Sequence, residues 1–204
     1  MAPDRRSHGF TTKTLNCIRP ELGSMVGLAR TVSVRSTRPS PLDPVALRDQ
    51  RFGYLDYLAE AAGPTISIVQ DLDDGQAGFG SFWGEVQANI HTRRGCVGTV
   101  TDGGVRDLDE MRDKGFNAFA AAVLVSHANI HIVAVNVPIT VGGLTVNPGD
   151  LVLGDQHGVT EVPLELVAKM PAAVERVEAK ERTIIDLCNS PEFTLDKLKA
   201  MYPG

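Results

Sequence analysis

Residues that could carry chemistry are concentrated between Gly84 and Asp107, in the segment GEVQANIHTRRGCVGTVTDGGVRD. The pattern predicts one helix that begins near Gly84-Glu85 and another that begins near Arg106-Asp107, with a short strand and a glycine turn between them. Unpaired backbone N–H groups at helix starts attract anions, and an arginine placed there offers a planar fork that suits a carboxylate. An aspartate at such a start can bind a hard divalent cation such as Mg²⁺. The simpler interpretation, a capping Asp107 and a surface ion pair for Arg106, stays open on these residues alone.

The histidines give weaker signals. His127 and His131, in HANIH, have the i, i+4 spacing that suits zinc on a helix, but the residues after His131 favour a strand. A structural or turn role is therefore favoured for both, and their function stays open. His91 is expected to be half exposed on its helix, and His157 is expected in a turn.

Three acidic residues lie close together before the segment. Asp71, Asp73 and Asp74 resemble the opening of a calcium loop, but Gln76 and Phe82 replace the glycine and glutamate that an EF-hand needs. An acidic, solvated loop is the favoured interpretation.

Composition excludes several classes of protein. The chain has 204 residues, a formal net charge of −5 and no basic stripe of the kind that duplex binding requires, so we expect no nucleic-acid partner. Its three cysteines, Cys17, Cys96 and Cys188, form no CxxC and are odd in number, which argues against a disulfide framework. No apolar run approaches the ~18 residues of a membrane span, and the first residues are too polar for a signal peptide, so we expect no membrane partner and a cytoplasmic location.

The first half of the chain alternates strands and helices. Even spacing of apolar residues predicts strands, and Asp43-Pro44 is typical of a helix start. The predicted strands are 25–36, 65–71 and 96–101, the predicted helices are 44–62, 82–94 and 105–114, and Asp102-Gly103-Gly104 is predicted as a tight turn.

The second half begins with short strands and ends in helices. Four apolar runs separated by glycine turns predict antiparallel strands at 130–141, 144–146, 151–153 and 159–162. A long helix is predicted from Pro163 to about Cys188, and a short one over 195–201. The fold class is therefore α/β with a mixed sheet. We expect an irregular N-terminal segment (1–22), a single domain (23–190), and a short C-terminal helix with a tail (191–204).

Three segments occur in a characteristic order: GLARTV at 27–32, the segment 84–107, and VGGLTVNPGDLVLGDQHGVTEVP at 141–163. Together they resemble the RraA-like family, which includes 4-hydroxy-4-methyl-2-oxoglutarate aldolases and oxaloacetate decarboxylases. Twenty residues separate Glu85 from Arg106, as that family's pattern requires. The resemblance implies a swivelling β/β/α sandwich with a mixed central sheet, assembled as a homotrimer or homohexamer.

The resemblance also implies roles for individual residues. Asp107 would ligate Mg²⁺, Mn²⁺ or another divalent metal. Arg106 would bind a 2-keto acid and offset the charge of the enolate, and Glu85 would orient water molecules around the metal. The substrate would lie against the backbone of Gly84, Glu85, Val86 and Gln87.

The implied activity is that of a metal-dependent class II pyruvate aldolase or oxaloacetate decarboxylase, a lyase that forms pyruvate enolate from a small 2-keto acid. Two alternatives stay open: a non-catalytic regulator that binds an RNA-degrading endonuclease, and a metal-dependent hydratase or hydrolase acting on another organic acid. The chain departs from the family pattern at Glu85, where the best-known aldolases have aspartate. It also has the irregular residues 1–22 where the family has a further helical segment.

Overall fold

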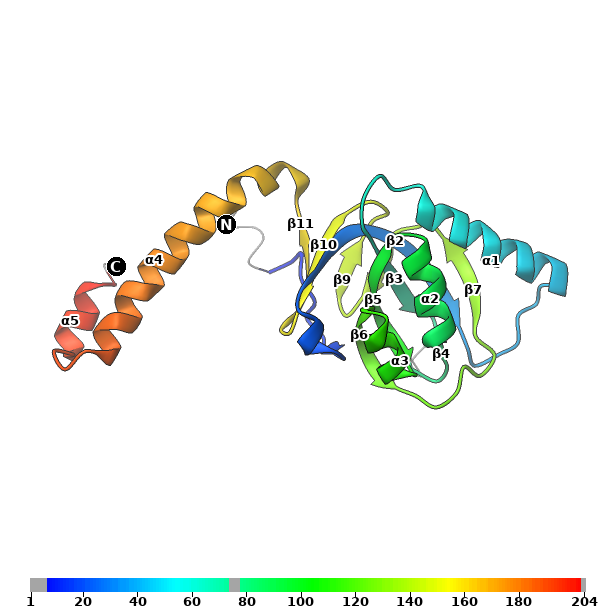
Figure 1. The fold of residues 1–204 in the computed structure, drawn as a ribbon, viewed down its shortest axis with the longest axis horizontal. Helices are drawn as coiled ribbons and strands as arrows, with labels where there is room; N and C mark the ends of the chain where they lie inside the picture. Colours follow the sequence, from blue (N-terminus) through cyan, green and yellow to red (C-terminus); the bar gives the residue numbers. More distant parts are fainter. Residues whose placement is uncertain (1–6, 74–77, 203–204) are drawn as a thin grey trace. The chain divides into compact units, whose positions relative to one another are not determined.

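The central sheet is mixed, as the sequence predicts. The structure, a computed structural model, describes residues 7–73 and 78–202, and within them nine strands form the order β1-β6-β5-β3-β2-β10-β11, with β4 beside β5 and β7 beside β2 (Figure 1). Neighbours run parallel among β2 (Met25–Arg35), β3 (Thr65–Asp71), β4 (Ser81–Trp83), β5 (Cys96–Val105) and β6 (Asn117–Val123). The antiparallel strands are β1 (Asn16–Cys17), β7 (His131–Val135), β10 (Leu151–Asp155) and β11 (Gly158–Val162).

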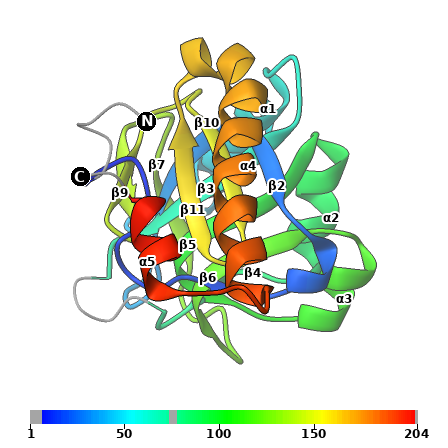
Figure 2. The ribbon, with the colours of Figure 1, turned by 90° about the vertical axis from the view of Figure 1, so that its left-hand side faces the viewer.

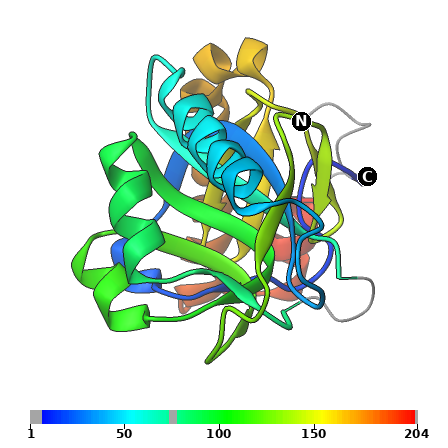
Figure 3. The same cartoon turned by 90° about the vertical axis from the view of Figure 1, so that its right-hand side faces the viewer.

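Each face of the sheet buries its own core. On one face lie α1 (Pro44–Ala59), α2 (Glu85–Arg93) and α3 (Leu108–Asp113), drawn in cyan and green on the near side of Figure 3. On the other lies the hairpin of β8 (Ile139–Val141) and β9 (Leu144–Val146). Side chains of a strand alternate between faces, so Ile66 and Ile68 pack in the hairpin core, whereas Val69 packs in the helical core. The layers are those of a β/β/α sandwich.

The structure corrects the prediction for the segment around the site. The predicted turn Asp102-Gly103-Gly104 is part of β5, which continues to Val105 because it pairs with β6, Gly104 opposite Ala122. A side chain at Gly104 would collide with Leu124, so glycine here permits close packing and does not mark a turn.

The two helices of this segment start later than predicted. Residues 82 and 83 belong to β4, which pairs with the end of β5, so α2 begins at Glu85. The second helix, α3, begins at Leu108 and not at Val105. Strand β6 was not predicted, because its sequence NAFAAAV is rich in alanine and has a single β-branched residue, Val123, at its end.

The chain divides into two compact units, Met1–Val162 and Pro163–Gly204. The second unit contains a 3₁₀ helix, η3 (Leu164–Lys169), followed by α4 (Met170–Asn189) and α5 (Leu195–Ala200), drawn in orange and red in Figure 2. This division falls after Val162, and α4 has no buried residues. Across residues 7–73 and 78–202, no helix combines the length and the apolar character needed to cross a membrane.

Candidate active site

The structure brings Gly84, Glu85, Arg106 and Asp107 together. Strand β4 lies parallel to the end of β5, with Trp83 opposite Val105, so the residues that follow each strand are neighbours. Arg106 N–H donates to the carbonyl oxygen of Trp83 at 3.2 Å. The twenty residues between Glu85 and Arg106 are therefore one helix and one strand, which return the chain to the same edge of the sheet.

Asp107 is bonded to the first residue of α2. Its Oδ2 accepts the backbone N–H of Glu85 at 2.9 Å, and its own backbone is in the left-handed region, with φ 53° and ψ 51°. Non-glycine residues in this region are uncommon and are found at functional sites. A Cβ at Gly84 would lie 2.5 Å from Asp107 Oδ2, so only glycine permits this approach. The backbone N–H groups predicted to bind the substrate are therefore fewer by one, because the Glu85 N–H already donates to Asp107. Val86 and Gln87 retain N–H groups without an intrahelical partner.

Arg106 has donors to spare. Its side chain is 38% exposed, and its only ion pair with the described residues is a loose 3.5 Å contact from Nη1 to Asp107 Oδ1. A guanidinium group carries five N–H donors. Most of them are thus available to a ligand.

A cleft of about 730 Å³ opens beside these residues. Its walls come from α1, from the β4–α2 segment, from Arg106, and from the loop that precedes β7. The charged or titratable lining residues are Arg48, Arg51, Arg106, His127 and His131. Among the described residues that line it there is no carboxylate, so the cleft suits an anion. The predicted substrate-binding residues Gly84, Val86, Gln87 and Arg106 all line it, whereas Glu85 and Asp107 do not.

The carboxylates fit a hydrated divalent metal better than a closed metal site. In the described part of the chain, no group of three or more His, Cys, Asp or Glu side chains could hold a metal ion. Mg²⁺ keeps several water molecules and needs only one or two carboxylates together with the substrate. Asp107, with Glu85 beside it, supplies that donor set. The helical zinc arrangement considered for His127 and His131 is absent among the described residues, because residues 126–130 form a loop with a turn at 128–129 and His131 begins β7.

His91 is buried, which corrects the prediction of a half-exposed residue. Its Nδ1 lies 2.7 Å from the carbonyl oxygen of Gln87, and its Nε2 lies 3.1 Å from the hydroxyl of Tyr54. Tyr54 in turn lies 2.6 Å from the hydroxyl of Ser67. Burial lowers the pKa of His91 to about 4, so the ring is neutral and joins α2 to α1 and β3. The amphipathic spacing of this short helix did not reveal that its histidine faces the core.

Asp71, the last residue of β3, and Asp73 are also buried, contrary to the prediction of an acidic, solvated loop. Asp73 accepts hydrogen bonds from the backbone and hydroxyl groups of Ser36 and Thr37, and Asp71 accepts the N–H groups of Asp73 and Gly78. These carboxylates hold loops together and do not line the cleft. Asp74 lies outside the described residues.

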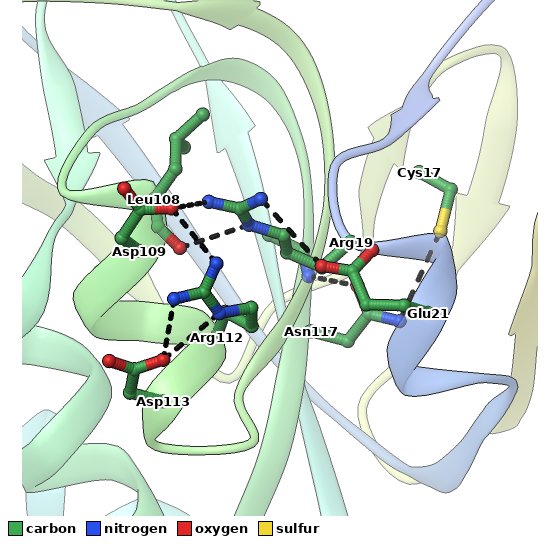
Figure 4. Close-up of polar contacts among 9 residues, drawn as sticks. Cys17, Arg19, Glu21, Leu108, Asp109, Arg112, Asp113 and Asn117 are labelled. Carbon is green, nitrogen blue, oxygen red and sulfur yellow. Dashed lines mark hydrogen bonds and ion pairs between the residues drawn. The ribbon is translucent and has the colours of Figure 1, made fainter.

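An arginine in the predicted irregular segment holds the start of α3. Arg19 Nε donates to the carbonyl oxygen of Leu108 at 3.1 Å, and its Nη2 pairs with Asp109 (Figure 4). Arg112 also pairs with Asp109, at 3.2 Å. The backbone directly after Asp107 is thereby clamped from another part of the chain. Sequence reasoning missed this residue, and no local pattern could have shown the contact across 89 positions.

The chain is similar in sequence to a known protein family. A family model described as RraA-like, Aldolase/RraA, matches residues 4–160. A protein of Halalkalibacterium halodurans that carries the provisional name 4-hydroxy-4-methyl-2-oxoglutarate aldolase is 24% identical over 205 residues, covering 93% of each chain. Other curated relatives match over smaller shares of their own length, 20% in one case and 50% and 61% in others.

Solved structures share the fold. An uncharacterised protein from Pseudomonas syringae aligns with a TM-score of 0.71 at 25% identity, covering 98% of this chain and 85% of its own. Streptomyces coelicolor RraAS2, described as an unusual member of the RNase ES inhibitor RraA protein family, aligns with a TM-score of 0.64 at 24% identity, covering 85% and 82% of the two chains. The mixed α/β architecture is therefore a known one.

Proposed function

Since this chain belongs to the RraA-like family, we propose that it is a divalent-metal-dependent lyase that cleaves a C–C bond of a small 2-keto acid through pyruvate enolate. The observation that carries the proposal is the contact of Asp107 with the first amide of α2, beside the spare donors of Arg106 and at the edge of a cationic cleft. The activity would be retro-aldol cleavage of a 4-hydroxy-4-methyl-2-oxoglutarate-type acid, decarboxylation of oxaloacetate, or both.

The chain's own groups suffice to bind and orient such an acid. The N–H groups of Val86 and Gln87 point out of the start of α2, where the helix dipole favours a carboxylate. Arg106 would donate to the keto oxygen, and it would bind more tightly as that oxygen becomes the enolate. A donor that gains strength as charge develops accelerates the chemical step.

A metal would be held by Asp107, with Glu85 orienting water molecules beside it. When bound, such an ion supplies Lewis-acid polarisation of the keto oxygen. The hydrogen bond from Glu85 N–H orients the Asp107 carboxylate whether or not the ion is present. We further propose a homotrimer or homohexamer and a cytoplasmic location, as the family resemblance and the composition suggest.

The test is pyruvate release from oxaloacetate and from 4-hydroxy-4-methyl-2-oxoglutarate, with Mg²⁺ and with EDTA, for the wild type, Asp107→Asn and the control Asp113→Asn. Asp113 is an exposed carboxylate on the same helix as the Asp107 cap. Because free Mg²⁺ decarboxylates oxaloacetate, each rate is compared with a blank without protein. We expect activity that EDTA and Asp107→Asn both remove and Asp113→Asn retains.

Absence of activity above the blank from the folded wild type would contradict the lyase proposal. Capture of an RNA-degrading endonuclease would then be the next measurement, because it tests the regulator alternative. Metal-dependent turnover of a different organic acid would support the hydratase or hydrolase alternative.

A further inference from the structure

The proposed lyase reaction needs a proton acceptor and donor. Retro-aldol cleavage requires removal of the proton from the 4-hydroxyl group, and the enolate must then receive a proton on carbon. Arg48 and Arg51 from α1, and Arg106 from the β5–α3 connection, line the cleft, but a guanidinium group only donates hydrogen bonds and has no acceptor. Among the described residues that line the cleft, His127 and His131 are therefore the side chains of the type that most often serves as general acid and base.

The loop that carries these histidines is held firmly against the site. Ser81 N–H, at the start of β4, donates to the carbonyl oxygen of Ser126 at 2.9 Å, and Asn129 N–H donates to that of Ser36 at 3.1 Å. A Cβ at Gly80 would lie 2.7 Å from the carbonyl oxygen of His127, so the strand and the loop are in close contact. The same strand leads directly to Gly84. The histidine loop and the substrate cradle therefore share one support.

The hydrogen bonds of the two rings leave one nitrogen of each available. His127 Nδ1 lies 2.7 Å from the carbonyl oxygen of Ala128, and His131 Nδ1 lies 2.9 Å from that of Asn129. Because a carbonyl oxygen only accepts hydrogen bonds, Nδ1 must carry the hydrogen in both rings. In the neutral ring, Nε2 then has the lone pair that a base needs. Neither Nε2 forms a hydrogen bond with the described residues.

We propose that His127 and His131 form the proton-transfer pair of the cleft, an inference that rests on the proposed lyase function. One imidazole Nε2 takes the proton of the substrate's 4-hydroxyl group. The C3–C4 bond breaks, its electron pair becomes the enolate, and C4 becomes a carbonyl carbon. The imidazolium then returns the proton to C3, which yields pyruvate and a neutral ring. Decarboxylation of oxaloacetate uses only the second transfer, because CO₂ leaves without deprotonation of a hydroxyl group, and the ring first takes the proton that it gives to C3 from the solvent.

This difference between the two reactions supplies the test. The variants are His127→Asn, His131→Asn and the double variant, since the asparagine amide retains a donor near the Nδ1 position and lacks a titratable nitrogen. His157→Asn is the control, because His157 is an exposed turn residue outside the cleft. The measurements are kcat and KM for aldol cleavage and for decarboxylation, their pH profiles, and the exchange of pyruvate methyl protons with deuterium from D₂O.

We expect the double variant to lose about 10²- to 10⁴-fold in kcat for aldol cleavage, with a smaller loss in decarboxylation and little change in KM. Added imidazole should restore part of the rate, which a purely structural defect would not allow. The two single variants show how much of the rate loss each histidine causes. A double variant that retains the wild-type rate and pH profile would overturn the proposal, as would equal losses in both reactions without rescue. If the wild type shows neither cleavage nor Asp107-dependent exchange, the lyase function itself fails, a result that is visible before any histidine is changed.

Discussion

The Oδ2 oxygen of Asp107 lies 2.9 Å from the backbone nitrogen of Glu85, so the carboxylate proposed to hold the metal is bonded to the first amide of the helix proposed to hold the substrate. Gly84 permits the approach, and Arg106 packs against the same glycine. These contacts join the residues of the site into one cluster. A substitution at each residue tests its contribution.

Gly84→Ala should weaken this contact without unfolding the protein. The new Cβ would lie 2.5 Å from Asp107 Oδ2 and 3.3 Å from Arg106, while the extended backbone of Gly84 tolerates alanine. We expect kcat/KM to fall at least about tenfold, the loss of one hydrogen bond to a charged group, and the Mg²⁺ dependence to shift to higher concentration. Gly53→Ala is the control, because no atom lies within 4 Å of its new Cβ. Unchanged Mg²⁺ dependence in Gly84→Ala would contradict the steric argument.

Arg106 should contribute to rate more than to ground-state binding. Removing one preorganised donor from a developing oxyanion costs about 10²- to 10³-fold in rate, so Arg106→Ala should lower kcat by about that factor. Arg106→Lys retains the charge but lacks the planar fork, so it should restore only part of the rate. Steady-state kinetics of both variants give kcat and KM. A wild-type kcat in Arg106→Ala would refute the role assigned to Arg106.

Arg51 should select acids that carry a second carboxylate. It lines the cleft from α1 and forms no hydrogen bond or ion pair with the described residues, whereas Arg48 pairs with Asp49 at 2.9 Å. In Arg51→Gln we expect KM for 4-hydroxy-4-methyl-2-oxoglutarate to rise about tenfold, which corresponds to ~1.4 kcal/mol, with kcat nearly unchanged. Arg176→Gln, at an exposed arginine of α4 that does not line the cleft, is the charge-matched control. Equal KM values in both variants would remove Arg51 from substrate recognition.

Buried His91 should make stability depend on pH. Burial lowers its pKa in the folded protein to about 4, against about 6.5 for free imidazole. The unfolded chain therefore binds the extra proton between these values. The contribution of neutral His91 to stability is complete above pH 6.5 and is lost as the pH falls toward 4.

Urea unfolding of the wild type and His91→Gln at pH 7.5 and pH 5 measures this contribution. Burial also raises the pKa of Asp102 to about 6, which favours the folded state on acidification, so the difference between the two proteins isolates the histidine. We expect the wild type to lose about 2 kcal/mol more than the variant over this range. Parallel pH dependence in both proteins would contradict a neutral, buried imidazole.

Much of the fold could be predicted from local pattern. Strand 65–71 was predicted with the bounds that the structure has, because a run of buried β-branched residues is a local signal. Strand β6 was missed because alanines carry no such signal and its place is decided by pairing with β5. The local pattern of Gly103 and Gly104 likewise indicated a turn, whereas pairing with β6 continues β5 through both residues.

The sequence by itself determined the family resemblance, the mixed α/β class and the spacing that brings Glu85 and Arg106 to one edge of the sheet. Only the tertiary structure decided what those residues face. The burial of His91, the clamp of Arg19 on Leu108, and the meeting of His127, His131 and Arg106 in one cleft join residues that are far apart in the chain. Such contacts arise from the packing of helices and loops on a shared sheet, and local periodicity carries no information about them.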